Sequence, residues 1–258
     1  HLGVFTVLRL VKALAEHDSV TSRLYLVTAN AQPAPGTAAP AADQAALWGL
    51  GRVIGHQELS ERWGGLIDVD DTDERPEMAT RICEHLLEGG PEDQVAIRGR
   101  TTYVPRLRPC AGLTRPFPTK LTPDGTYVVT GGAGALGRVV ATYLAERGAR
   151  HITLLGRTAL PPRSRWSELS DGDPHFATVS TIHAIERLGV QIATASVDIA
   201  DRDQVTTWLA NHVGEGGRPV RGIVHAAGSV NDQLLVNMSE ADFAAVLAPK
   251  ITGTRVLH

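Results

Sequence analysis

A glycine-rich segment at positions 130–137 contains the residues with the clearest chemical meaning. It reads Thr-Gly-Gly-Ala-Gly-Ala-Leu-Gly, and Gly132, Gly134 and Gly137 have the spacing G-x-G-x-x-G. The first glycine of such a motif permits a tight turn, the second lets the backbone approach a pyrophosphate, and the third lets a helix pack on a strand. An ordinary glycine-rich turn is the alternative. The segment lies between a β-branched strand and an amphipathic helix, and this context favours a phosphate site. The candidate residues are Thr130, Gly131, Gly132, Gly134, Ala135, Leu136 and Gly137.

Arg157 follows the next predicted strand and bears on the choice of cofactor. Dinucleotide folds that prefer NAD carry an acidic residue at this place, where it holds the ribose 2′-hydroxyl. A guanidinium can instead pair with a 2′-phosphate. Arg157 therefore predicts NADPH, and a solvated surface arginine is the alternative.

The ends of two further strands add candidate cofactor contacts. Asp198, next to Ile199, could accept a hydrogen bond from the adenine amino group, or it could cap the helix that begins near Asp201. The fourth strand ends in a histidine followed by small residues, which would allow a ribose and a nicotinamide to approach closely. These candidates are His225, Ala226, Ala227 and Gly228.

Alternating strand and helix patterns must position these residues. In the second half, the periodicity predicts strands at 126–130, 151–155, 191–196 and 222–225 and helices at 134–147, 181–188, 204–213 and 240–258. This order is typical of an α/β fold with a doubly wound parallel sheet. Positions 157–179, rich in proline and charged residues, are predicted to form a surface loop.

The first half alternates in the same way but has no glycine-rich turn between a strand and a helix. The patterns predict helices at 1–17, 43–54 and 76–87, strands at 23–28 and 65–69, and a strand pair at 94–98 and 102–106. We therefore expect no nucleotide site in this half. A stretch dense in turn-forming residues predicts a boundary near residue 120, with one domain at 1–120 and a dinucleotide-binding domain at 121–258.

Composition excludes several classes of protein. The 25 Lys and Arg residues against 28 Asp and Glu leave a formal charge of −3 and no basic block, which argues against nucleic acid and anionic membranes. Cys83 and Cys110 lie in unrelated contexts, so neither a metal site nor a disulfide framework is indicated, and a reducing cytoplasm is expected. The apolar runs fall far short of the roughly 20 residues that a membrane span requires.

Several segments together resemble the ketoreductase domain of modular (type I) polyketide synthases, a branch of the short-chain dehydrogenase/reductases. In the second half the resemblance rests on positions 130–137, 154–157, 197–201 and 223–228. In the first half, Ala-Leu-Trp-Gly-Leu-Gly-Arg-Val at 46–53 and Glu-Arg-Trp-Gly-Gly-Leu-Ile-Asp at 61–68 look like the structural subdomain that precedes the catalytic one. The resemblance covers nearly the whole chain. It implies two Rossmann-like subdomains, the second truncated on its C-terminal side.

The resemblance also implies an activity and its partners. Members of this family use NADPH to reduce a β-ketoacyl group that phosphopantetheine tethers to an acyl carrier protein, beside the neighbouring domains of the synthase. Lys250, in Leu-Ala-Pro-Lys-Ile-Thr-Gly, matches the family's catalytic lysine, although by itself it would read as a solvated helical residue. Asp232 aligns with the last residue of a Leu-Asp-Asp signature of the B-type stereochemical class, but Val230 and Asn231 depart from it. Asp232 could instead cap a turn.

The proton donor of the family has no counterpart by motif in this sequence. None of the four tyrosines is followed at the fourth position by lysine or asparagine, and the expected serine, tyrosine and asparagine would follow His258. The 258 residues alone are therefore expected to be inactive. The alternatives are a non-catalytic nucleotide-binding or scaffolding module and another short-chain reductase or nucleotide-sugar epimerase. The tryptophan-containing first half argues against an epimerase.

Overall fold

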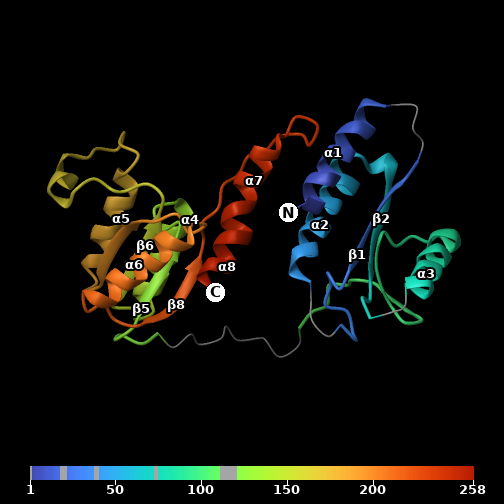
Figure 1. Cartoon of the computed structure of the whole chain (residues 1–258). Helices are drawn as coiled ribbons and strands as arrows, with labels where there is room; N and C mark the ends of the chain where they lie inside the picture. Colours follow the sequence, from blue (N-terminus) through green and yellow to red (C-terminus); the bar gives the residue numbers. More distant parts are fainter. Residues whose placement is uncertain (1, 18–21, 38–40, 73–74, 111–120) are drawn as a thin grey trace. The chain divides into compact units, whose positions relative to one another are not determined.

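The computed structural model describes residues 2–17, 22–37, 41–72, 75–110 and 121–258. These residues form two units, each built on its own four-stranded sheet (Figure 1). The first unit comprises His1–Ala111 with Asp232–Glu240, and the second comprises Gly112–Asn231 with Ala241–His258. The boundary predicted near residue 120 lies outside the described residues.

The first unit is a mixed sheet with helices on both faces (Figure 1). Its strands lie in the order β1 (Leu24–Ala29), β2 (Trp63–Val69), β3 (Gln94–Arg98) and β4 (Thr101–Tyr103). The first three are parallel, and β4 pairs antiparallel with β3, which confirms the predicted strand pair. The helices are α1 (Leu2–Glu16), α2 (Ala42–Val53) and α3 (Arg75–Glu88), and a π turn (Ile54–Glu58) and a 3-10 turn (Ser60–Arg62) follow α2.

The chain's own polar side chains fill the carboxyl end of this first sheet. Asp68 is fully buried on β2, where it accepts hydrogen bonds from Thr28 Oγ1 at 2.6 Å and Ala31 N at 2.8 Å. The buried Arg98 guanidinium pairs with Asp68 at 2.6 Å. Trp48 Nε1 donates to Thr28 Oγ1 at 2.9 Å. Open α/β sheets bind ligands at this end of their strands, so the network gives a structural reason to expect no nucleotide in the first unit.

A test of this expectation is Thr28→Val, which keeps the side-chain shape but removes the hydroxyl. The buried Trp48 N–H and the Asp68 carboxylate then each lose a partner, so we expect the free energy of unfolding to fall by about 2 kcal/mol. Affinity for NADPH should stay unchanged. Urea unfolding followed by tryptophan fluorescence and calorimetric titration measure the two quantities. Thr80→Val, which removes an exposed hydroxyl on α3, is the control, and a shift in NADPH affinity only in Thr28→Val would contradict the expectation.

The second unit has the predicted doubly wound parallel sheet. The strands are β5 (Thr126–Thr130), β6 (His151–Gly156), β7 (Gln191–Ser196) and β8 (Val220–His225), and they lie in the order β7-β6-β5-β8. All three strand pairs are parallel. The chain moves outward from β5 to β7 and then returns to the other side of β5. The order of connection therefore reverses between β5 and β8, where such sheets bind their ligands.

Helices cover both faces of this sheet, because alternate residues of each strand point to opposite sides. On one face Val129 and Ile152 pack with α4 (Ala135–Glu146) and α5 (Phe176–Glu186). On the other face Val128 and Leu155 pack with α6 (Arg202–Gly214) and Val256. No helix in the described part of the chain is long and apolar enough to cross a bilayer.

The predicted surface loop at 157–179 is wrong in part. It contains a 3-10 helix (Arg163–Glu168), and α5 begins at Phe176 rather than at position 181. Trp166 is buried in the main core, where its Nε1 donates to Pro161 O at 2.8 Å. The Arg163 guanidinium carbon lies 4.6 Å from the centre of the Trp166 ring. One aromatic side chain thus fixes a polar segment to the core, an effect that local composition does not reveal.

The single helix predicted at 240–258 is divided into three parts. The parts are α7 (Glu240–Ala248), a π turn (Pro249–Gly253) and α8 (Thr254–Leu257). Proline has no N–H to donate and its ring crowds the preceding turn, so Pro249 interrupts the regular helical bonding. Lys250 lies in this π turn.

Candidate functional site

The glycine-rich segment forms a tight turn between β5 and α4. Gly131 has a left-handed φ of 66°, so the tight turn depends on Gly131. The motif assigned this role to Gly132, which does not have a positive φ. Gly134 N donates to Gly131 O at 2.9 Å and closes the turn. Gly134 is also the N-cap residue of α4. The unpaired N–H groups of the first helical turn, at 135–137, thus begin directly after the glycine turn.

Three of these glycines have different surroundings, and only two of them are required by the packing of the protein. A Cβ at Gly132 would lie 2.6 Å from the Cβ of Leu154 on β6. A Cβ at Gly137 would collide with the Gly131 carbonyl oxygen, so this glycine allows α4 to pack on the turn, whereas the motif predicted packing of the helix on the strand. A Cβ at Gly134 would meet only Gly131 O, at 3.2 Å, and the backbone at Gly134 is extended. The space beside Gly134 is therefore open for a ligand rather than occupied by the protein.

A pocket of about 370 Å³ lies at the carboxyl end of the second sheet. It brings together the glycine turn, the ends of β6 and β7, the segment after β8 and the end of α7. Its lining includes most of the candidate cofactor residues, namely Gly131, Gly134, Arg157, Asp198, Ile199, Ala226, Ala227 and Gly228. Small residues thus form the side of the pocket next to β8, as the sequence predicted. Five other candidates from the glycine-rich segment do not line the pocket, namely the buried Thr130, Gly132 and Gly137 and the exposed Ala135 and Leu136.

Arg157 and Asp198 are the two charged candidates that line the pocket, and they make different hydrogen bonds. Arg157 is exposed and follows β6, and its carbonyl accepts a hydrogen bond from Ser196 Oγ at 2.8 Å. Asp198 Oδ1 accepts from Ala200 N at 2.9 Å. The N-cap of α6 is Asp201, not Asp198, so the capping alternative for Asp198 is wrong. Hydrogen bonds from the backbone and side chain of Gln204 lower the pKa of the Asp201 carboxyl.

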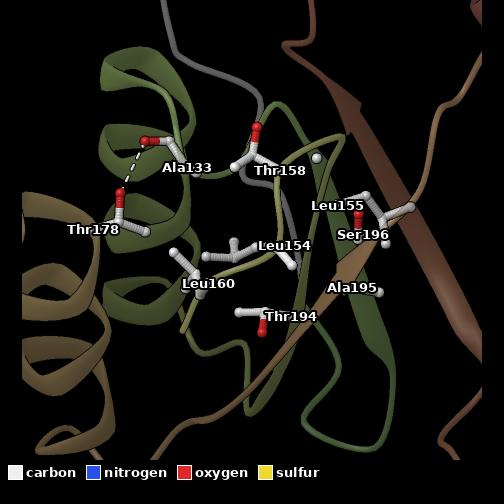
Figure 2. Close-up of a pocket in the computed structure, with 11 residues that line it drawn as sticks. Ala133, Leu154, Leu155, Thr158, Leu160, Thr178, Thr194, Ala195 and Ser196 are labelled. Atoms are coloured by element: carbon white, nitrogen blue, oxygen red, sulfur yellow. Dashed lines mark hydrogen bonds between the residues drawn. The ribbon is translucent and has the colours of Figure 1, made fainter. Parts of the chain in front are cut away.

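A second cavity of about 140 Å³ lies beside the glycine turn, between β6, β7 and the segment at 158–160 (Figure 2). Figure 2 shows Thr178 of α5 pointing to Ala133 on the turn, and Thr178 Oγ1 donates to the Ala133 carbonyl at 3.0 Å. Arg138 also donates to this carbonyl, at 2.8 Å. The sequence predicted that Thr178 lies in a loop. No local pattern indicates its bond to Ala133, because the two residues are 45 positions apart.

His225 joins three segments around the larger pocket. Its Nδ1 is 2.7 Å from Thr130 Oγ1 on β5, and its Nε2 is 2.9 Å from the Pro249 carbonyl oxygen. Thr130 Oγ1 also accepts from Ala227 N at 3.2 Å. The sequence predicted His225 and Thr130 only as cofactor contacts, whereas here they bond to each other.

The two predicted catalytic residues lie in different environments. Lys250 is exposed, and its side chain extends along Gly228, where an added Cβ would lie 2.9 Å from Lys250 Nζ. Asp232 is exposed and belongs to the stretch grouped with the first unit, so its role stays a prediction. Among the described residues, the lining of the larger pocket includes no tyrosine.

Comparison with protein families matches both halves of the chain. The model described as KR domain matches residues 125–258. The model described as polyketide synthase extender module SpnB, Rossmann fold domain, matches residues 1–107. Together the two matches account for nearly the whole sequence.

Similar proteins are polyketide synthases. A phenolphthiocerol/phthiocerol polyketide synthase of Mycobacterium tuberculosis (strain CDC 1551 / Oshkosh) is 37% identical over 252 residues, which cover 96% of this chain and 13% of the relative. The 6-methylsalicylic acid synthase of Penicillium terrestre is 38% identical over 247 residues, which cover 95% of this chain and 13% of the relative.

Solved structures of ketoreductases have the same fold. An A1-type ketoreductase is 34% identical with a TM-score of 0.79, and the match covers 98% of this chain and 50% of that chain. An A-type ketoreductase from a modular polyketide synthase is 32% identical with a TM-score of 0.77 and the same coverage. This chain thus spans about half the length of these solved ketoreductases. The chain belongs to the KR domain family, the ketoreductases of polyketide synthases.

Proposed function

We propose that this chain binds NADPH in the pocket at the carboxyl end of its second sheet and contributes that site to the reduction of a β-ketoacyl group. The observation that carries the proposal is one pocket lined by the open glycine turn, by Arg157 and by the small residues after β8. Family membership favours a reductase over the epimerase alternative. Calorimetric titration of the chain with NADPH tests the proposal, and an absence of binding would contradict it.

The residues of the pocket fit the chemistry of a dinucleotide phosphate. The N–H groups at the start of α4 and the bare backbone at Gly134 suit a pyrophosphate. Arg157 supplies a cation at the end of β6, where a ribose 2′-phosphate would meet it. Asp198 offers a carboxylate to the adenine amino group, and the segment 226–228 leaves room for the ribose and nicotinamide.

When bound, NADPH would supply the hydride for the keto carbon. Lys250 would then lie near the nicotinamide end of the pocket, since its side chain extends along Gly228. The resemblance to ketoreductases assigns this lysine to lowering the pKa of a tyrosine that gives a proton to the new alkoxide. We further propose that the substrate is held on the phosphopantetheine of an acyl carrier protein and that neighbouring synthase domains deliver it, because the relatives are much longer synthases.

Arg157→Ala tests the choice of cofactor. Loss of a charge-assisted pair with the 2′-phosphate should weaken NADPH binding by about 1 to 2 kcal/mol, or roughly 5- to 30-fold, and change NADH binding much less. Parallel titrations with both cofactors measure the difference. Arg187→Ala removes another exposed arginine, at the end of α5, and should leave both affinities unchanged. Equal losses for NADPH and NADH in Arg157→Ala would defeat the assignment.

A further inference from the structure

The backbone on both sides of the Lys250 α-carbon is held by side-chain hydrogen bonds. The Pro249 carbonyl accepts from His225 Nε2 at 2.9 Å, and the Lys250 carbonyl accepts from Thr254 Oγ1 at 2.6 Å. These carbonyls belong to the two peptides that flank the lysine. In a π turn, where regular helical bonding is interrupted, such bonds limit the rotation of the backbone that directs the Lys250 side chain.

The other side of the His225 ring is bound to the sheet. Pro249 O can only accept, so His225 Nε2 carries the hydrogen. In the neutral ring Nδ1 then has no hydrogen and can only accept, so Thr130 Oγ1, which also accepts the N–H of Ala227, donates its own hydrogen to His225 Nδ1. In the series Ala227 to Thr130 to His225 to Pro249, each hydrogen bond thus has a defined donor and acceptor. The series selects the Nε2–H tautomer and connects the end of β5 to the turn that holds Lys250.

The same segment also limits where the lysine side chain can lie. Gly228 follows Ala227 directly, and its missing Cβ leaves the space that Lys250 Cε and Nζ occupy, 2.9 Å from where that Cβ would stand. Ala227 and Gly228 line the larger pocket. The backbone of Lys250 is thus fixed through His225, and its side chain runs along the wall of the candidate cofactor site.

We propose that His225 is a positioning residue for Lys250. It holds the Pro249–Gly253 turn to Thr130, so that the ammonium group stays beside the nicotinamide end of the pocket. This inference rests on the proposed function, in which Lys250 supports proton transfer to the substrate. Loss of the ring bonds would let the turn rotate, and displacement of a catalytic group by about 1 Å can cost on the order of 100-fold in rate.

A double-mutant cycle in the synthase that carries this chain tests the proposal. His225→Leu should lower kcat by about 10- to 100-fold while the KM for NADPH changes less than about threefold. In a Lys250→Met background, His225→Leu should have almost no further effect on kcat, because both changes remove the same contribution. Thr181→Val, which removes an exposed hydrogen bond within α5 and does not affect the pocket lining, is the control and should leave kcat unchanged.

Two amide substitutions distinguish the hydrogen bond of Nε2 to Pro249 from that of Nδ1 to Thr130. His225→Gln carries its amide to the position of Nε2 and can still bond to Pro249, so it should recover most of the lost rate. His225→Asn reaches only the position of Nδ1, near Thr130, and should not recover it. Equal rates for the Gln, Asn and Leu variants, or additive effects in the cycle, would overturn the proposal. This comparison remains decisive if the leucine variant fails to fold.

The catalytic role of Lys250 and the positioning role of His225 would be contradicted by different results. A wild-type rate for Lys250→Met would contradict the catalytic assignment of that lysine. The attachment of the turn would then be tested by amide hydrogen exchange at positions 251–253. Faster exchange in His225→Leu than in Thr181→Val is the expected result, and unchanged protection would show that His225 does not hold the turn.

Discussion

Under the proposed function, Lys250→Met should lower the rate of β-ketoacyl reduction by about 100-fold or more. Positioned groups that support proton transfer typically contribute 10²- to 10⁴-fold, and a phenol with an ordinary pKa near 10 needs a nearby cation to titrate closer to neutral pH. Methionine keeps much of the side-chain length but has no charge. Because Lys250 is exposed, the fold should persist. The measurement is NADPH oxidation with a model β-ketoacyl thioester.

The pH dependence gives this prediction a second readout. Without the ammonium group, the pKa of the proton-donating phenol should return toward its ordinary value, and the pH profile of kcat should shift to higher pH. The matched control is Lys12→Met, which removes a lysine from α1 in the first unit. An unchanged rate and profile in Lys250→Met would refute the assignment of this lysine.

Gly134→Val should weaken NADPH binding by about 100-fold, which corresponds to about 2.7 kcal/mol. Gly134 has φ −71° and ψ 166°, a conformation that valine adopts readily. The new Cβ would meet only the Gly131 carbonyl oxygen, at 3.2 Å. The fold should therefore survive, while a branched side chain would occupy the space where the pyrophosphate approaches the start of α4. Calorimetric titration and urea unfolding measure the two effects.

Gly137, in the same segment, provides the comparison for this prediction. At Gly137 an added Cβ collides with the Gly131 carbonyl oxygen and lies 2.7 Å from the Gly132 α-carbon, both of which are backbone atoms. Gly137→Ala should therefore lower the free energy of unfolding by about 1 to 3 kcal/mol through overpacking. If Gly134→Val kept the wild-type NADPH affinity, the turn would not act as the phosphate site. A loss of stability as large as that of Gly137→Ala would instead contradict the open space beside Gly134.

The sequence was sufficient to predict the strands of the second sheet and their order along the chain. The alternating pattern predicts strands at 126–130 and 191–196, each followed by a helix, and the structure has strands at these same positions. The glycine spacing at 130–137 also predicted the strand–turn–helix correctly. These features are local, because each depends on the conformational preferences and periodicity of consecutive residues. The resemblance to ketoreductases rested on the same short segments, and the comparisons confirmed it.

The structure alone determined how distant side chains act on one another. Nothing near Trp166 indicates that it is buried, because its partners lie on other elements of the core. Similarly, Thr178 bonds to Ala133, and His225 links Thr130 to Pro249. Residues that are 24 to 95 positions apart meet only after the sheet and helices have packed. The sequence thus determined which groups could bind a dinucleotide, whereas the tertiary fold determined which of them line the pocket and which hold its walls in place.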